Sequence, residues 1–261
     1  MANSHEKRIR TAFTRQAPTF EEERLNTAFT SSVPWLLDHL APEADDVILD
    51  VAGGTGIVSR SLAPRVARVV SIDSTPAMID EGIRCAAVEG LANLDFVRGT
   101  VEALPFASAA FTLVFARFAL HHLTDPRRVV VEMARVCRPG GRVAVMDLAA
   151  STDPGIAKQQ NQMERLRDPS HVRMLTRGVV PQWLHQHGLV VDRVTEQEID
   201  RPVHPWLEQA GTEKSAAARI HDAFVAELDG GAETGMCPHR GTDGASLWFR
   251  QLWEITVAHK G

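Results

Sequence analysis

The strongest constraint on the fold is the alternation of short apolar segments with helical segments between residues 46 and 148. The apolar segments are almost continuous in Val, Ile, Leu, Ala and Phe, which is typical of strands buried on both faces of a parallel sheet. We expect strands at 46–51, 67–72, 93–98, 110–116 and 142–148, with helices at about 56–63, 75–89 and 126–138. This order predicts a doubly wound α/β fold with helices on both faces of the sheet.

The flanking segments extend this plan. Apolar residues recur at helical intervals within residues 1–40, so we expect helices there. Thr176 is expected to cap a helix that runs to His187, and strands are expected at 189–199 and 247–257. Between these two strands, residues 200–246 are rich in Pro and Gly and contain one helical pattern, at about 212–228. We interpret them as an insertion before the last strand.

Composition excludes several classes of protein. Hydrophobic residues make up 44% of the 261 residues, which is enough for a full core. No apolar run approaches the roughly 20 residues that span a membrane, and the N-terminus lacks the apolar core of a signal peptide. The net charge of −5 is spread along the chain, and the three cysteines are scattered. We therefore expect a cytoplasmic protein with no nucleic-acid partner, membrane span or metal site. The sequence is compatible with a homodimer.

A glycine-rich turn follows the first expected strand. Asp50–Gly56 reads DVAGGTG, and Asp73 ends the second strand. A strand, a tight turn and a helix start let a nucleoside ligand approach the backbone closely. An acid after the second strand can accept hydrogen bonds from two ribose hydroxyls. From the glycines alone, a site for NAD, a site for S-adenosylmethionine (SAM) and a plain tight turn are all compatible.

Four motifs resemble a single family. They are LDVAGGTG (Leu49–Gly56), EALPF (Glu102–Phe106), LTDP (Leu123–Pro126) and ARVCRPGGRVAVMD (Ala134–Asp147). Together they are similar to class I SAM-dependent methyltransferases related to the ubiquinone/menaquinone biosynthesis C-methyltransferases, the methyltransferase domain type 11 group. The resemblance implies SAM as the cofactor and a Rossmann-like, seven-stranded sheet whose last strand is antiparallel. We then expect a helical lid at 1–40, a SAM-binding core at 41–199, an acceptor cap at 200–246 and the final core strand at 247–261.

The resemblance also implies which residues bind the cofactor. They are Phe20, Asp50, Ala52, Gly53, Gly54, Gly56, Asp73, Ser74, Met78, Thr100, Val101 and Arg117. In this pattern Asp73 holds the ribose, the glycine-rich backbone lies against the methionine part, and Arg117 offers its backbone carbonyl to the SAM ammonium. Relatives mostly have Asp where Thr100 stands and often Tyr where Phe20 stands. Thr100 would therefore meet the adenine as a neutral acceptor, and Phe20 would cover the sulfonium with its ring.

His121 and His122 follow the fourth strand, at the edge of the crevice where the methyl group of SAM is expected. An imidazole can take a proton from a phenol or an amine as the methyl group arrives. We predict that one of the pair, His121 before His122, is catalytic, and the alternative is that both are structural. His171, His185, His187 and His239 are expected at the surface or in loops.

The methyl acceptor is less constrained by the sequence. The quinone enzymes tend to have Arg-Asn where this chain has His121-His122, so a quinone acceptor is not expected. We predict a small-molecule methyltransferase that methylates an O, N or C atom of an aromatic or apolar acceptor, as in secondary metabolism. The alternatives are a SAM-binding protein of the same fold that does not methylate, and an NAD-dependent dehydrogenase.

Overall fold

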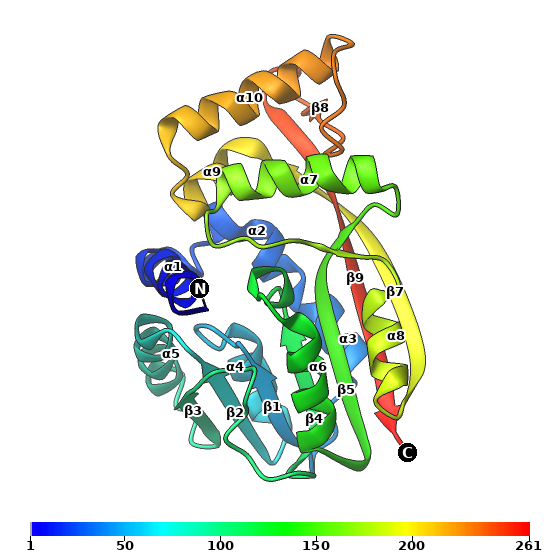
Figure 1. The fold of residues 1–261 in the computed structure, drawn as a ribbon. Helices are drawn as coiled ribbons and strands as arrows, with labels where there is room; N and C mark the ends of the chain where they lie inside the picture. Colours follow the sequence, from blue (N-terminus) through cyan, green and yellow to red (C-terminus); the bar gives the residue numbers. More distant parts are fainter. Residues whose placement is uncertain (1) are drawn as a thin grey trace.

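The computed structural model describes residues 2–261 and contains a central sheet with helices packed against it (Figure 1). The strands are β1 (Val47–Val51), β2 (Arg68–Asp73), β3 (Leu94–Arg98), β4 (Phe111–Arg117), β5 (Cys137–Ala150), β6 (Leu175–Thr176), β7 (Leu189–Pro202), β8 (His239–Arg240) and β9 (Leu247–Lys260). Seven of them follow the order β3-β2-β1-β4-β5-β9-β7, and the short strands β6 and β8 pair with β5 and β9.

The helices fill the connections between these strands. They are α1 (Ala2–Gln16), α2 (Glu23–Ser31), α3 (Val33–Leu40), α4 (Ile57–Leu62), α5 (Pro76–Val88), α6 (Pro126–Val136), α7 (Pro154–Arg167), α8 (Val179–Gln186), α9 (Val203–Ala210) and α10 (Lys214–Leu228), with 3-10 turns η1 (Ala17–Thr19), η2 (Ala63–Arg65) and η3 (Leu120–His122). Within residues 2–261, no helix is both long and apolar enough to cross a membrane.

The strand directions confirm the predicted Rossmann-like sheet. Strands β3, β2, β1, β4 and β5 are parallel to their neighbours, whereas β9 is antiparallel to both β5 and β7. Because parallel strands share one direction, the carboxyl ends of β1, β2 and β4 meet at the same edge of the sheet. This is the edge at which open α/β sheets bind their ligands.

Both faces of the sheet are covered by apolar packing. Along β4, Val114 and Ala116 face the cluster that contains α6 and α8, whereas Leu113 and Phe115 face the cluster that contains α3 and α4. This alternation is the period of two that a strand requires, with both sets of side chains buried. It explains why β4 is apolar from Leu113 to Ala116 and lacks the polar face of a half-exposed strand.

Two local predictions were wrong, and one helix was missed. Gly178, at a φ of 80°, is the N-cap of α8, and Thr176 lies in β6 and so caps no helix. The segment 200–246 contains two helices, α9 and α10, where one was expected. Helix α7 was not expected, because its sequence PGIAKQQNQMERLR is mostly polar and offers few apolar residues for a helical stripe.

Helices α7, α9 and α10 lie together over one end of the long strands β7 and β9 (Figure 1). They share a separate apolar cluster that includes Trp206, Phe224 and Phe249. The ring centroids of Trp206 and Phe249 are 4.5 Å apart, and those of Phe224 and Phe249 are 5.8 Å apart. Since Phe249 belongs to β9, the inserted helices pack directly on a strand of the main sheet.

This packing predicts that the inserted helices unfold together with the sheet. Phe224→Ala removes a fully buried ring, so we expect it to lower the free energy of unfolding by about 3–5 kcal/mol. The control is Val88→Ala, because Val88 is 79% exposed and its truncation should change stability by less than about 0.5 kcal/mol. Denaturant titration measures both. A loss below about 1 kcal/mol for Phe224→Ala would mean that the insertion opens independently of the sheet.

Candidate functional site

A cavity lies at the carboxyl ends of the parallel strands, and residues of α1 line its other side. It contains about 1320 Å³ of space between atoms, its opening to solvent included. All but one of the predicted site residues line it: Phe20, Asp50, Ala52, Gly53, Gly54, Asp73, Ser74, Met78, Thr100, Val101, Arg117, His121 and His122. The exception is Gly56, which begins α4 at a φ of 72° and packs against the ring of Phe96.

The glycine-rich turn has to be narrow where it borders the cavity. A Cβ atom on Gly53 would lie 2.3 Å from Ser71 Oγ and 2.8 Å from the carboxylate of Asp50, so no larger residue fits. Gly54 adopts a φ of 59° in the left-handed region, which glycine reaches without strain. The result is a stretch of backbone that a ligand can approach closely.

Asp73 is held at the end of β2 by two backbone groups. Its Oδ2 accepts the N–H of Gly54 at 3.0 Å, and its Oδ1 accepts the N–H of Thr75 at 2.8 Å. Each carboxylate oxygen therefore keeps a lone pair for one hydroxyl of a ribose. Burial raises the pKa of Asp73, while its backbone hydrogen bonds act in the opposite direction.

Thr100 and Glu102 border the cavity on the side of β3. The Thr100 hydroxyl donates to Glu102 Oε2 at 2.6 Å, so the hydroxyl oxygen stays available as an acceptor. A carboxylate is therefore present in this loop although Thr100 stands where the family resemblance implies an Asp. The predicted contact of Thr100 with adenine stays a prediction, with Glu102 as an additional acceptor that the sequence reasoning missed.

Asp50 and Arg117 form the floor of the cavity. Burial raises the pKa of Asp50 to about 7, against the lowering effect of its hydrogen bond from Ser59 (2.7 Å) and of the Arg117 charge. The Arg117 guanidinium donates to Ser32 Oγ at 2.7 Å and stacks 5.0 Å from the ring centres of Phe29 and Phe118. Sequence reasoning gave Arg117 only a backbone role, and its side chain in fact ties the floor to the N-terminal helices.

His121 is bound by a carboxylate on the neighbouring strand. Its Nδ1 lies 2.5 Å from Oδ1 of Asp147 on β5, and Asp147 Oδ2 accepts the N–H of Leu120 at 2.7 Å. Because Asp147 accepts at Nδ1, the proton of the neutral ring lies on Nδ1 and the lone pair lies on Nε2. No hydrogen bond to Nε2 is found within residues 2–261. Burial alone would lower the pKa of His121, but the Asp147 carboxylate outweighs it and raises this pKa above its ordinary value.

His122 has different surroundings. Its Nδ1 lies 3.1 Å from Ser170 Oγ, and its ring meets Phe13 edge-on at 5.0 Å between centroids. Burial, and then the charge of His121, lower the pKa of His122 to about 3, so its ring is neutral at physiological pH. The backbone carbonyl of His122 accepts from His5 Nε2 at 2.7 Å, which ties α1 to this loop.

The remaining histidines lie where they were expected, at the surface or in loops. His171 lies in a loop and is buried there, with its Nε2 2.9 Å from Asn161 Oδ1. Its ring centroid is 5.5 Å from that of His121, so it packs behind the candidate base. His185 is exposed, and His187 and His239 are partly exposed. Among residues 2–261, no group of His, Cys, Asp and Glu is arranged to hold a metal ion.

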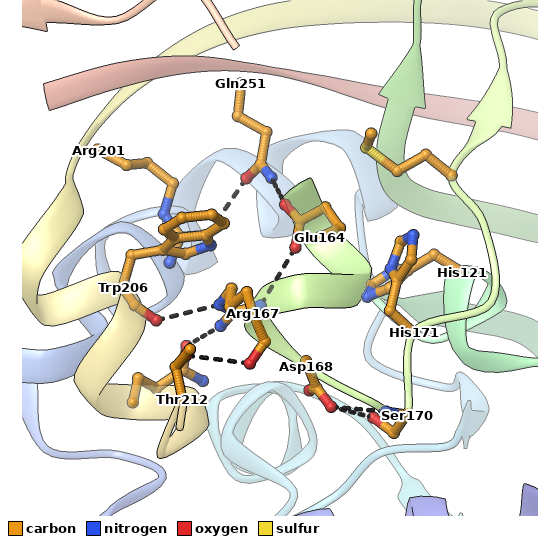
Figure 2. Close-up of polar contacts among 12 residues, drawn as sticks. His121, Glu164, Arg167, Asp168, Ser170, His171, Arg201, Trp206, Thr212 and Gln251 are labelled. Atoms are coloured by element: carbon orange, nitrogen blue, oxygen red, sulfur yellow. Dashed lines mark hydrogen bonds and ion pairs between the residues drawn. The ribbon is translucent and has the colours of Figure 1, made fainter. Parts of the chain in front are cut away.

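Several polar residues of the cavity were not found from the sequence. They are Glu6, Gln16, Arg167, Asp168, Arg201 and Gln209. They belong to α1, the end of α7, β7 and α9, which come together only in the folded chain. Figure 2 shows three of them, Arg167, Asp168 and Arg201. No motif marks them, so no sequence signal could have identified them as one group.

Comparisons with known proteins agree with this geometry. The methyltransferase domain family matches residues 49–145. The methyltransferase YcgJ of Bacillus subtilis is 31% identical over 169 residues, which cover 65% of this chain and 67% of that protein. A ubiquinone/menaquinone biosynthesis C-methyltransferase of Roseobacter denitrificans is 36% identical over 126 residues, and the match spans 50% of its length.

Solved structures show the same fold. The crystal structure of YcgJ from Bacillus subtilis superposes with a TM-score of 0.80 at 25% identity and covers 88% of this chain and 98% of YcgJ. Geranyl diphosphate C-methyltransferase from Streptomyces coelicolor, solved with S-adenosyl-L-homocysteine, gives a TM-score of 0.64 at 15% identity, with 88% and 78% of the two chains covered. The chain belongs to the class I SAM-dependent methyltransferases, and its cofactor is SAM.

The position of Asp73 predicts its effect on cofactor binding. Two charge-assisted hydrogen bonds to ribose hydroxyls should contribute roughly 2–4 kcal/mol, so Asp73→Ala should weaken SAM binding by roughly 30- to 900-fold. Titration calorimetry measures the affinity, and the melting temperature checks that the variant is folded. Asp95→Ala is the matched control, since Asp95 is exposed on the neighbouring strand β3. Equal SAM affinity in a folded Asp73→Ala protein would refute the ribose assignment.

Proposed function

We propose that this methyltransferase transfers the methyl group of SAM to an oxygen or nitrogen of a small, largely apolar acceptor, with His121 as the general base. The observation that carries the proposal is the His121–Asp147 pair at the edge of the cavity. SAM supplies an electrophilic methyl group on its sulfonium, so the protein has to bind, align and deprotonate the acceptor.

The fit of the cavity to the cofactor rests on its own residues. Three groups of the cavity match three parts of SAM. The Gly53–Gly54 backbone allows the methionine part to approach closely, and the two oxygens of Asp73 can accept from the ribose hydroxyls. The Thr100–Glu102 loop offers acceptors to the adenine. The Asp50 carboxylate in the floor, beside Arg117, offers an acceptor to the ammonium of the methionine part. Phe20 lies 6.0 Å from Phe29 between ring centroids, and both rings line the cavity, where an aromatic face favours a sulfonium.

The proposed proton transfer uses the free nitrogen of His121. As the lone pair of the acceptor atom attacks the methyl carbon, the C–S bond breaks and the sulfonium becomes a neutral thioether. The acceptor proton goes to His121 Nε2, and the imidazolium that forms is stabilised by the Asp147 carboxylate at Nδ1. His122 is not suited to this role, because its lowered pKa makes it a weak base.

The nature of the acceptor is supported by the rest of the lining. Ile9, Phe13, Phe118 and Leu148 border the cavity beside the histidine pair, so an aromatic or otherwise apolar body can be enclosed there. The proposed lid and cap roles of residues 1–40 and 200–246 rest on the same observation, since α1 and α9 contribute lining residues.

A second candidate function is SAM binding without methyl transfer. The solved [4+2]-cyclase SpnF shares this fold with a TM-score of 0.61 at 17% identity, which is a likeness of fold alone. Incubation of the protein with methyl-labelled SAM and a panel of phenols, amines and their carboxylic acid derivatives separates the two functions. Only a methyltransferase moves the label to the acceptor.

His121 and Asp147 predict a specific pH dependence. The base must be neutral, so activity falls as pH drops through the pKa of His121, and this pKa is raised by Asp147. We expect the acidic limb of kcat/KM to lie above the ordinary histidine value of about 6.5. Asp147→Asn removes the charge that raises the pKa, so it should move the limb to lower pH and also slow turnover.

The matching substitution of the base should act differently. His121→Asn should lower kcat by roughly 10²–10⁴-fold and flatten the acidic limb, with SAM affinity retained. His185→Asn, on the exposed end of α8, is the control that should change neither quantity. Normal turnover and an unshifted limb in His121→Asn would mean that proximity alone drives the reaction.

A further inference from the structure

A buried cluster of polar side chains borders the cavity, with Arg167 and Arg201 in its lining (Figure 2). It joins Arg167 and Glu164 of α7 to Arg201 of β7 and Gln251 of β9. Glu164 is 1% exposed and both Arg201 and Gln251 are 4% exposed, so these groups are sheltered from bulk water. Polar groups in such a place are stable only when their hydrogen bonds and charges are satisfied.

Arg167 is satisfied within the protein. Its Nη1 pairs with Glu164 Oε2 at 3.4 Å, its Nη2 donates to Gln209 Oε1 at 2.6 Å, and its Nε donates to the carbonyl of Trp206 at 3.0 Å. Its guanidinium also lies 5.1 Å from the ring centre of Trp206. The charge of Glu164 is therefore used mainly by Arg167.

Arg201 is not satisfied in the same way. Its Nη1 donates to the neutral oxygen of Gln251 at 3.2 Å, and no ion pair of Arg201 is found among the described residues. The orientation of Gln251 is fixed, because its amide nitrogen donates to Glu164 Oε1 at 2.7 Å and its oxygen accepts from Trp253 Nε1 at 3.0 Å. Burial, and next the charge of Arg167, lower the pKa of Arg201 to about 9, and Glu164 compensates only in part.

A second donor without a partner reaches the cavity from α1. Gln16 is 4% exposed and lines the cavity, and its Nε2 is buried with no hydrogen-bond partner in the described chain. An amide donor and a cationic guanidinium thus border the same space with hydrogen bonds left to give. Unpaired donors of this kind are costly in a folded protein unless a ligand accepts from them.

The other carboxylate at this end is already engaged. Asp168 Oδ1 accepts both the N–H and the hydroxyl of Ser170, at 2.8 and 2.7 Å. Burial alone would raise the pKa of Asp168, but the charge of Arg167 and the hydrogen bonds from Ser170 act against it and lower this pKa. Asp168 therefore acts on Arg167, and no carboxylate pairs with Arg201 among the described residues.

We infer that Arg201, with Gln16, forms a subsite for a carboxylate of the methyl acceptor. The inference rests on the proposed function and names the class of acceptor: an apolar molecule with an O–H or N–H group at one end and a monocarboxylate at the other. A carboxylate fits because one guanidinium offers a single fork of N–H groups and a single charge. A phosphate group would call for a second free cation, and Arg167 is already paired.

The test compares ligands that differ only in charge. The probes are 4-hydroxybenzoate, 4-hydroxycinnamate and longer 4-hydroxyphenyl alkanoates, each with its carboxamide and its phosphonate analogue. Their affinities are measured by calorimetry with S-adenosylhomocysteine at saturation. We expect at least one acid to bind tenfold or more tightly than its amide, and more tightly than its phosphonate. In Arg201→Gln the preference for the acid should fall below about twofold, a loss of about 1 kcal/mol.

Matched variants separate recognition from folding. Arg201→Lys keeps the positive charge but loses the forked N–H groups of the guanidinium, so it should retain part of the preference for the acid. Arg250→Gln is the control, because Arg250 is an exposed residue of β9 paired with Asp200, and it should leave this preference unchanged. S-adenosylhomocysteine affinity checks that each variant is folded. Acids and amides that bind alike across the panel, tighter phosphonates, or a preference that survives Arg201→Gln would each overturn the inference.

The same panel distinguishes this inference from the proposed function. Methyl transfer to amides but not to acids would support the function and overturn the carboxylate subsite. Arg201-dependent binding of an acid without any methyl transfer would support the subsite and overturn the function.

Discussion

The carboxylate of Asp147 is the interaction on which the arrangement of the cavity depends. From its place on β5 it accepts the backbone N–H groups of Leu120 and Leu148 and binds Nδ1 of His121. A buried carboxylate with this many donors fixes the turn after β4 against the sheet. That turn presents His121 to the cavity, and the carbonyl of His122 binds His5 of α1, so the cover of the cavity depends on the same turn.

Charged side chains line the cavity in two groups. Asp50, Asp73 and Glu102 line it together with Arg117, and Arg201 lines it without a carboxylate partner among the described residues. The carboxylates suit the positive charges of SAM, and the proposed carboxylate of the acceptor suits Arg201. The reacting atoms would then meet beside His121 and the apolar side chains.

The fold could be predicted from the sequence wherever local patterns decide it. Apolar strands, the DVAGGTG turn and the antiparallel last strand follow from patterns within short segments and from the family resemblance. Helix α7 could not be predicted, because its polar sequence is stabilised by packing against α10 and by the pairing of Glu164 with Gln251, 87 residues away. The burial of His171 and the position of the buried Arg201 guanidinium beside the cavity likewise arise only from long-range contacts.

The central claim is that the cavity orients SAM with its ribose on Asp73 and its sulfur toward His121. A crystal structure with S-adenosylhomocysteine tests it most directly. Both ribose hydroxyls should lie within hydrogen-bond distance of Asp73, about 2.5–3.0 Å, and the sulfur atom should face His121 and the apolar lining. A ribose held by other residues, or a sulfur atom turned away from His121, would show that SAM is oriented differently.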